Sequence, residues 1–335
     1  MRRALFVATG FICLFFFLLP ERILSQQTNG KTLLWRITGK NLVKPSYLFG
    51  TIHLTDKKLF FFGDSVYAAI ENTAGFAIEV NPDEFSGYIV NNMFDALQAK
   101  KIKEILNEKE FDKYGTGLSK KLNKPAGDIT TSDILREKNK WMNDLMGKNR
   151  MATFVDAYLY NIARRQGKWV GGIEDLSDQT GLLNELVDKS DIAFISSGDT
   201  KKADNSLNKM MQLYQQEDIE GINRMVDDGG PQNRDILLTR RNIKMARRMD
   251  SLSAFRSMFF AVGAAHLPGD SGVIAMLRSR GFTVEPVYST AKKEAALYTY
   301  KEVPQPWTAI KGEKIIIRFK CPATRLPLCS MVLLK

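Results

Sequence analysis

The chain contains only two histidines, and both close the same four-residue phrase, Gly-x-x-His. One phrase ends at His53 and the other at His266, and each follows a short apolar run that is typical of a buried strand. Imidazole is the commonest side-chain ligand for transition metals and the only side chain whose ordinary pKa lies near neutrality. The matched contexts therefore raise the hypothesis that the two rings meet in one site.

Two glutamates occupy comparable positions in the sequence. Glu79 lies within an apolar strand-like phrase, where an unpaired carboxylate would be costly to bury. It could pair with a basic side chain, bind a metal, or act as a base with a raised pKa. Glu174 follows a short strand-like run, although the neighbouring Asp175 is equally compatible with a solvated turn or a helix start.

Parallel α/β sheets bind their ligands beyond the carboxyl ends of the strands, where these four side chains are expected. Two imidazoles with one or two carboxylates would suit zinc, manganese or cobalt, and an open position would admit an activated water. The competing interpretation is that each histidine is a satisfied polar residue at a strand end. The spacing differs from His-Glu-x-x-His, in which one helix face fixes both ligands. Two nitrogens on one metal would lie about 3–4 Å apart.

A basic helix begins near Thr239 and includes Arg240, Arg241 and Lys244. A solvated face is its simplest explanation, but one arginine could reach the site and hold a substrate carbonyl or carboxylate. The chain lacks a Gly-x-Ser-x-Gly elbow and a phosphate-binding glycine loop. Serine-hydrolase and nucleotide chemistry are therefore disfavoured.

Strand and helix patterns alternate at both ends of the chain around a helical middle. Predicted strands cover 32–38, 46–52, 75–80, 168–173, 257–262 and 282–288, the first two as a hairpin; predicted helices cover 64–71, 85–166 with breaks at 114–117 and 125–127, 177–249, and 271–280. This succession predicts an α/β fold: a central, mostly parallel sheet flanked by helices, with a large helical insert at about 85–250.

The first 25 residues have the pattern of a signal peptide, with a basic start and an apolar run from Ala4 to Pro20. An uncleaved anchor is the alternative, since the run approaches the length that spans a bilayer. We therefore expect an exported protein, periplasmic or secreted, with membrane contact only through this segment. The formal charge of +11 is dispersed and no recognition motif accompanies it, so no nucleic-acid partner is expected.

Residues 26–290 are predicted to form the folded domain, and residues 291–335 an irregular C-terminal extension. The extension contains one candidate strand at 314–319 and the two cysteines outside the signal segment, Cys321 and Cys329. An exported protein permits a small disulfide between them, although two free thiols fit the sequence as well.

Five phrases resemble the TraB/GumN family, which includes the animal Tiki proteins. They are LFGTIHLTD (48–56), FAIEV (76–80), GGIEDLSDQ (171–179), RRN (240–242) and AVGAAHLPGDSGVIAMLRSRGF (261–282). The resemblance extends over about residues 33–287. It implies an α/β fold related to the erythromycin-esterase and ChaN-like proteins.

The resemblance also implies a metal-dependent peptidase of the Tiki kind. Its site residues would be His53, His266 and Glu79, with Glu174 and Arg241 in support. The leading expectation is thus an exported hydrolase of peptide or protein substrates that uses manganese, cobalt or zinc. Glu79 would be a metal ligand or the base that deprotonates a bound water. The alternatives are a non-catalytic module that binds a small molecule or haem, and a metal-independent, esterase-like hydrolase with histidine as general base.

Overall fold

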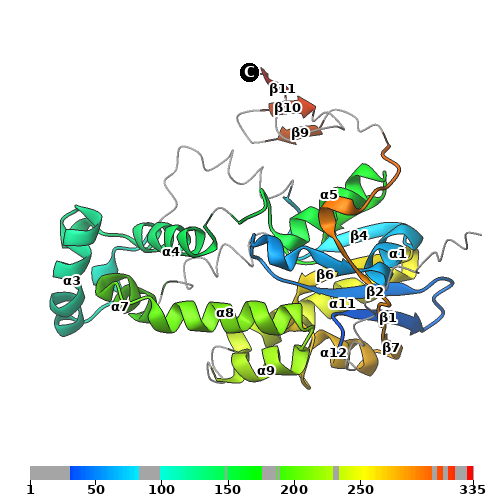
Figure 1. Ribbon diagram of the computed structural model, residues 1–335, viewed down its shortest axis with the longest axis horizontal. Helices are drawn as coiled ribbons and strands as arrows, with labels where there is room; N and C mark the ends of the chain where they lie inside the picture. Colours follow the sequence, from blue (N-terminus) through cyan, green and yellow to red (C-terminus); the bar gives the residue numbers. More distant parts are fainter. Residues whose placement is uncertain are drawn as a thin grey trace, which may run out of the picture.

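The computed structural model describes residues 31–82, 99–147, 149–175, 187, 189–228, 234–303, 308–311, 316–320 and 330–334. The predicted signal segment and both C-terminal cysteines lie outside these residues. The described chain forms an α/β body from which a group of helices extends to one side (Figure 1).

The body is built on a six-stranded sheet in the order β5-β4-β6-β2-β1-β7. The strands are β1 (Leu34–Gly39), β2 (Ser46–Thr51), β4 (Gly75–Ile78), β5 (Trp169–Gly172), β6 (Met258–Gly263) and β7 (Phe282–Pro286). β5, β4, β6 and β2 run parallel, whereas β1 is antiparallel to both β2 and β7. The predicted α/β class, the mostly parallel sheet and the first hairpin are confirmed.

The register of the central strands brings the two histidine phrases together. β2 and β6 are parallel neighbours, with Gly50 opposite Val262 and Thr51 opposite Gly263. β4 pairs with the other edge of β6, with Ile78 opposite Ala261. The chain therefore leaves all three strands at one edge of the sheet, which is where ligands bind in this class of fold.

Helices cover both faces of the sheet (Figure 1). α1 (Asp64–Asn72) and α5 (Val155–Arg165) lie on one face, and α11 (Arg240–Phe255) and α12 (Val273–Ser279) on the other. Successive side chains of a strand point to opposite faces. Phe259 accordingly packs in the core under α5, while Phe260 packs in the core under α11. Burial on both faces explains why these strands are continuous apolar runs.

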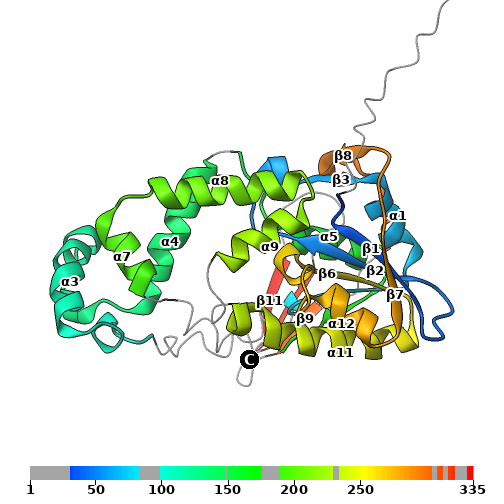
Figure 2. The ribbon, with the colours of Figure 1, turned by 90° about the horizontal axis from the view of Figure 1, so that it is seen from below.

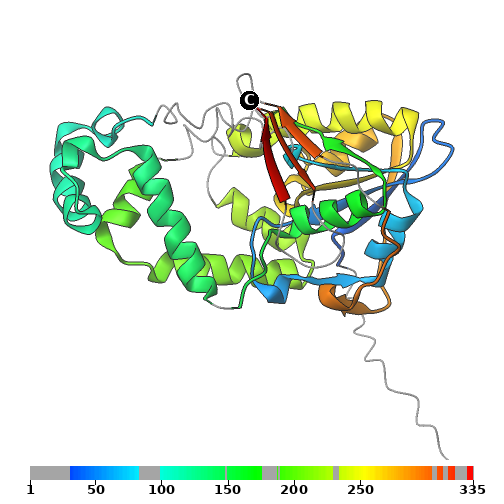
Figure 3. The ribbon, with the colours of Figure 1, turned by 90° about the horizontal axis from the view of Figure 1, so that it is seen from above.

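The extending helices form an arm with a core of its own. The arm contains α3 (Glu108–Leu122), α4 (Thr131–Met146) and α7 (Lys189–Ser197), and α8 (Lys201–Gln215) leads back towards the sheet (Figures 2 and 3). Its buried residues include Ile102, Leu118, Ile134, Ile192 and Ile195. None of the described helices is long and apolar enough to cross a membrane.

The predicted helix break at 114–117 is wrong, because α3 runs through it without interruption. The glycines there serve packing instead. A Cβ on Gly117 would lie 2.7 Å from Ser196 Oγ and 3.1 Å from its carbonyl oxygen, so glycine lets α7 approach α3 closely. The break at 125–127 is confirmed: α3 ends at Leu122, and Asn123 takes the left-handed conformation that often follows a helix.

The C-terminal region has more strand than the sequence predicted. β9 (Thr308–Lys311), β10 (Ile316–Lys320) and β11 (Ser330–Leu334) pair in an antiparallel sheet. Before them, β8 (Lys292–Glu294) pairs with β3 (Phe61–Gly63) on the body. The division at residue 290 stays a prediction.

We expect Gly117→Ala to destabilise the protein although alanine favours helix formation by about 1 kcal/mol. The added methyl group would overpack the contact with Ser196, which typically costs about 1–3 kcal/mol. Gly127→Ala is the matched control, since a Cβ there meets nothing within 4 Å. Urea unfolding should show a lower midpoint for the first variant alone; equal midpoints would contradict this account of α3.

Candidate functional site

The two histidines lie at the carboxyl ends of neighbouring strands and face one carboxylate. His53 follows β2, and His266 ends the short turn η5 (Ala264–His266) directly after β6. His53 Nε2 is 3.8 Å from one oxygen of Glu79, and His266 Nε2 is 3.7 Å from the other. The His266 ring is buried, whereas the side chain of His53 is 52% exposed.

Glu79 directly follows β4 and is buried between the histidines and an arginine. Its Oε1 accepts a hydrogen bond of 2.7 Å from the backbone N–H of Gly263, and its Oε2 accepts one of 2.7 Å from Arg241 Nη2. A Cβ on Gly263 would lie 3.3 Å from Oε1. Glycine at this position thus leaves room for the carboxylate to approach the end of β6.

The surroundings of Glu79 keep its carboxylate charged. Burial alone would raise its pKa, but charge interactions with His266, His53 and Arg241 outweigh burial and hold the pKa well below its usual range. Of the roles open to Glu79 in the sequence, ion pairing is therefore present in the structure. A base with a raised pKa is not.

Glu174 is a partner of Arg241. The guanidinium binds it through two hydrogen bonds, Nε to Oε1 at 2.8 Å and Nη2 to Oε2 at 2.6 Å. The backbone N–H groups of Ile173 and Glu174 also donate to the carbonyl oxygen of Glu79, at 3.0 and 2.7 Å. Burial works to lower the pKa of Arg241, but the two glutamates raise it, so the guanidinium stays charged.

The structure thus brings together all five residues singled out in the sequence, and it adds two. Asp156, in the first turn of α5, places Oδ2 3.0 Å from His53 Nδ1. Asn242, in the first turn of α11, places Oδ1 2.6 Å from His266 Nδ1. Asn242 lies inside the RRN phrase, so a signal for it was present. Asp156 resembles any acidic residue at a helix start, and a single sequence does not distinguish it.

The two histidines differ in charge despite their matched phrases. Burial lowers the pKa of His266 to about 4. The carboxylate of Glu79 opposes this shift, but the positive charge of Arg241 acts with burial, so this ring is neutral at pH 7. Burial also opposes protonation of His53, but the carboxylates of Asp156 and Glu79 prevail and raise its pKa well above the ordinary value. His53 therefore holds a proton more strongly than His266 does.

The donor chemistry of this cluster suits a divalent transition metal, namely two imidazole Nε2 atoms beside one buried carboxylate. Among the described residues of the cluster, three carboxylates, of Glu79, Glu174 and Asp156, lie around one guanidinium, that of Arg241, and this balance of charge favours a cation. Within the described ranges, however, no three or more histidine, cysteine, aspartate and glutamate side chains form an assembled metal site. The two oxygens of Glu79 already accept hydrogen bonds, from Arg241 and from the backbone N–H of Gly263.

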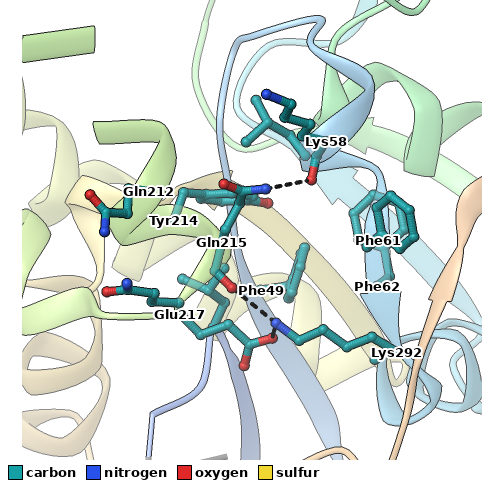
Figure 4. Close-up of a pocket in the computed structure, with 13 residues that line it drawn as sticks. Phe49, Lys58, Phe61, Phe62, Gln212, Tyr214, Gln215, Glu217 and Lys292 are labelled. Atoms are coloured by element: carbon teal, nitrogen blue, oxygen red, sulfur yellow. Dashed lines mark hydrogen bonds and ion pairs between the residues drawn. The ribbon is translucent and has the colours of Figure 1, made fainter. Parts of the chain in front are cut away.

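A separate cavity of about 490 Å³ lies between η1 (Lys57–Leu59), β3, β8 and the end of α8 (Figure 4). Its apolar lining comes from Leu33, Phe49, Leu59, Phe61 and Phe62. Lys292 closes one side by pairing with Glu217 at 2.7 Å and donating to the Gln215 carbonyl at 3.1 Å. Neither histidine lines it, but Tyr214 does, and the Tyr214 hydroxyl donates to the carbonyl of Gly50 in the first histidine phrase.

Two curated relatives are metalloproteases. The chain is 24% identical to Metalloprotease TIKI2 of Xenopus tropicalis over 313 residues, which cover 72% of this chain and 57% of the relative. It is 21% identical to Metalloprotease TIKI2 of Danio rerio over 348 residues, which cover 82% and 64%. The chain thus spans less than two thirds of either relative. No solved structure matches it.

The sequence profile of the TraB/PrgY/gumN family matches residues 33–286, most of the chain. The matched region contains both Gly-x-x-His phrases together with Glu79, Glu174 and Arg241. The resemblance seen in the sequence is thereby confirmed, and the chain belongs to the TraB/PrgY/gumN family.

Proposed function

We propose that this protein is an exported, metal-dependent hydrolase that cleaves peptide bonds. One observation carries the proposal: the only two histidines of the chain direct Nε2 at opposite oxygens of one buried carboxylate. Family membership and the similarity to metalloproteases support the peptidase class. The substrate is accordingly a peptide or protein, and the predicted signal segment accounts for export.

His53, His266 and Glu79 are the residues that would hold the metal, which is zinc, manganese or cobalt. Bound there, such an ion would supply a Lewis acid and a water of lowered pKa. Because its pKa is far below neutrality, Glu79 is a weak base, and we assign it the role of ligand. Arg241 keeps Glu79 anionic and oriented, and Glu174 fixes Arg241 through its paired hydrogen bonds.

His53 is more exposed than Glu79, Arg241 and His266, and we assign the approach of the substrate to its side. This side chain is half-exposed, and the exposed ring of Phe154 stands edge-on to it, with ring centroids 6.4 Å apart. A substrate that approaches His53 therefore meets an apolar surface beside a charged cluster. Such a surface fits a peptide better than a nucleic acid, whose phosphates would face Glu79 and Asp156.

Small-molecule binding is the second candidate function, and the cavity beside Tyr214 favours it. Its volume of about 490 Å³ and its aromatic lining lie within the usual range of small-molecule sites. Because neither histidine lines this cavity, it offers no axial imidazole to a haem.

Metal binding should depend on each histidine separately. The purified protein is expected to retain a divalent transition metal, and His53→Ala or His266→Ala should each abolish retention, because neither ring alone completes the ligand set. Glu285→Gln is the control, because Glu285 occupies an exposed position of the edge strand β7 and pairs with Arg36 rather than with a residue of the cluster. Metal content after dialysis measures the outcome, and undiminished content in both histidine variants would end the proposal.

Metal affinity should rise with pH around neutrality. The raised pKa of His53 means that this ring must lose a proton before Nε2 can bind, whereas His266 is already neutral. Titration calorimetry in buffers of different ionisation enthalpy should therefore detect protons released on metal binding. A release of zero at neutral pH would contradict the assignment of His53 as a ligand.

Peptide hydrolysis should disappear on thorough chelation and return when zinc, manganese or cobalt is added. A mixed peptide library analysed by mass spectrometry measures it without a chosen substrate. Hydrolysis that survives chelation would favour the metal-independent, esterase-like alternative with histidine as general base. A small molecule retained in native mass spectra, without any hydrolysis, would favour the binding module.

A further inference from the structure

The Nδ1 atoms of both histidines are held by residues to which no role has been given so far. Asp156 contacts His53 Nδ1 at 3.0 Å, and Asn242 contacts His266 Nδ1 at 2.6 Å. We infer that Asp156 and Asn242 are positioning residues that keep a proton on Nδ1 of each ring, so that Nε2 is the nitrogen that offers a lone pair beside Glu79 whenever the ring is neutral. The tautomers follow from hydrogen bonding alone, while their use as metal ligands rests on the proposed function.

For His266, the hydrogen bonds of Asn242 decide the tautomer. Asn242 Nδ2 lies 2.7 Å from the carbonyl oxygen of Ser271, which can only accept a hydrogen bond. The amide nitrogen must therefore face Ser271, and the amide oxygen must face the ring. An amide oxygen also only accepts, so Nδ1 of His266 has to donate. With Nδ1 protonated in a neutral ring, Nε2 is the acceptor.

For His53, the carboxylate of Asp156 likewise can only accept while it is charged. The surroundings of Asp156 indicate that its main partner is His53 Nδ1. The side chain is 9% exposed, its Oδ1 has no hydrogen-bond partner, and no lysine or arginine among the described residues pairs with it. Glu79 and Glu174, by contrast, share Arg241.

Stability does not account for a buried carboxylate of this kind. Its position in the first turn of α5 gives a small stabilisation through the helix dipole. Burying a charge without a full set of partners costs more than this stabilisation returns. Among the described side chains, His53 is the partner of the Asp156 carboxylate. We therefore assign to Asp156 the role of orienting the His53 ring.

Asp156 and Asn242 reach the histidines from opposite faces of the sheet, because α5 and α11 cover opposite faces. α5 precedes β5 and α11 precedes β6, and each helix runs back along the sheet before its strand begins. The first turn of each helix therefore lies at the edge where the parallel strands end. Strands β2 and β6 carry the histidines to this edge, and α5 and α11 supply the acceptor for each Nδ1. Metal-binding histidines commonly have such a partner, and its loss typically weakens metal binding by about 10–100-fold.

Nitrogen NMR of the ¹⁵N-histidine-labelled, metal-free protein tests the tautomer directly, because the chain has only two imidazoles. At neutral pH we expect His266 to be protonated at Nδ1 and not at Nε2, and we expect Asn242→Ala to lose that preference. The exposed Asn205→Ala on α8 is the control. A wild-type His266 with its proton on Nε2 would overturn the inference, whether or not the protein binds metal.

Zinc affinity, measured by calorimetry, tests the consequence. Asp156→Asn keeps the size of the side chain but removes the anionic acceptor, and we expect zinc to bind about 10–100-fold more weakly, as in Asn242→Ala. Asp175→Asn controls for charge, because it removes a neighbouring carboxylate that bonds to Lys244 and Arg248. Variants that fold and bind zinc as tightly as the wild type would overturn the positioning role. A wild type that binds no metal would refute the proposed function and leave the NMR result to decide the tautomers.

Discussion

The arrangement of the site depends on the ion pairs that Arg241 forms with Glu79 and Glu174. Its guanidinium bonds to Glu79 and Glu174, two buried carboxylates that follow adjacent strands β4 and β5 and would otherwise repel each other. The same residue anchors the start of α11, so one cation ties two strands to one helix. Removing one partner of such a buried network typically costs about 3–5 kcal/mol, because the remaining charge is left uncompensated.

The two histidines are chemically different although Glu79 lies at nearly the same distance from both, 3.8 Å from His53 Nε2 and 3.7 Å from His266 Nε2. His266 is enclosed, meets an amide oxygen at Nδ1 and lies near Arg241, so it stays neutral. His53 is half-exposed and lies between two carboxylates, so it takes up a proton. The repeated Gly-x-x-His phrase therefore indicates equal backbone positions at the ends of parallel strands, while helices α5 and α11 determine the charge of each ring.

Much of the fold could be predicted from the sequence, because strands buried on both faces leave continuous apolar runs and parallel pairing brings their ends together. The convergence of His53, Glu79 and His266 follows from that logic. The pairing of Glu174 with Arg241 requires contacts between distant segments, and Asp156 has no local signature. The error at 114–117 has a specific cause: Gly117 admits α7, and a glycine needed for close packing has the same sequence signal as a glycine that ends a helix.

The charges of the cluster explain why a proton and a metal ion would compete for it. Among the described residues, three carboxylates, of Glu79, Glu174 and Asp156, lie around one guanidinium, so this set of side chains is anionic when both histidines are neutral. A proton on His53 offsets part of this excess, which is why the pKa of that ring is raised. A divalent cation would neutralise the cluster more completely. The acidity of the surroundings therefore favours a cation at the histidines, while Arg241 limits how much of Glu79 is available to bind it.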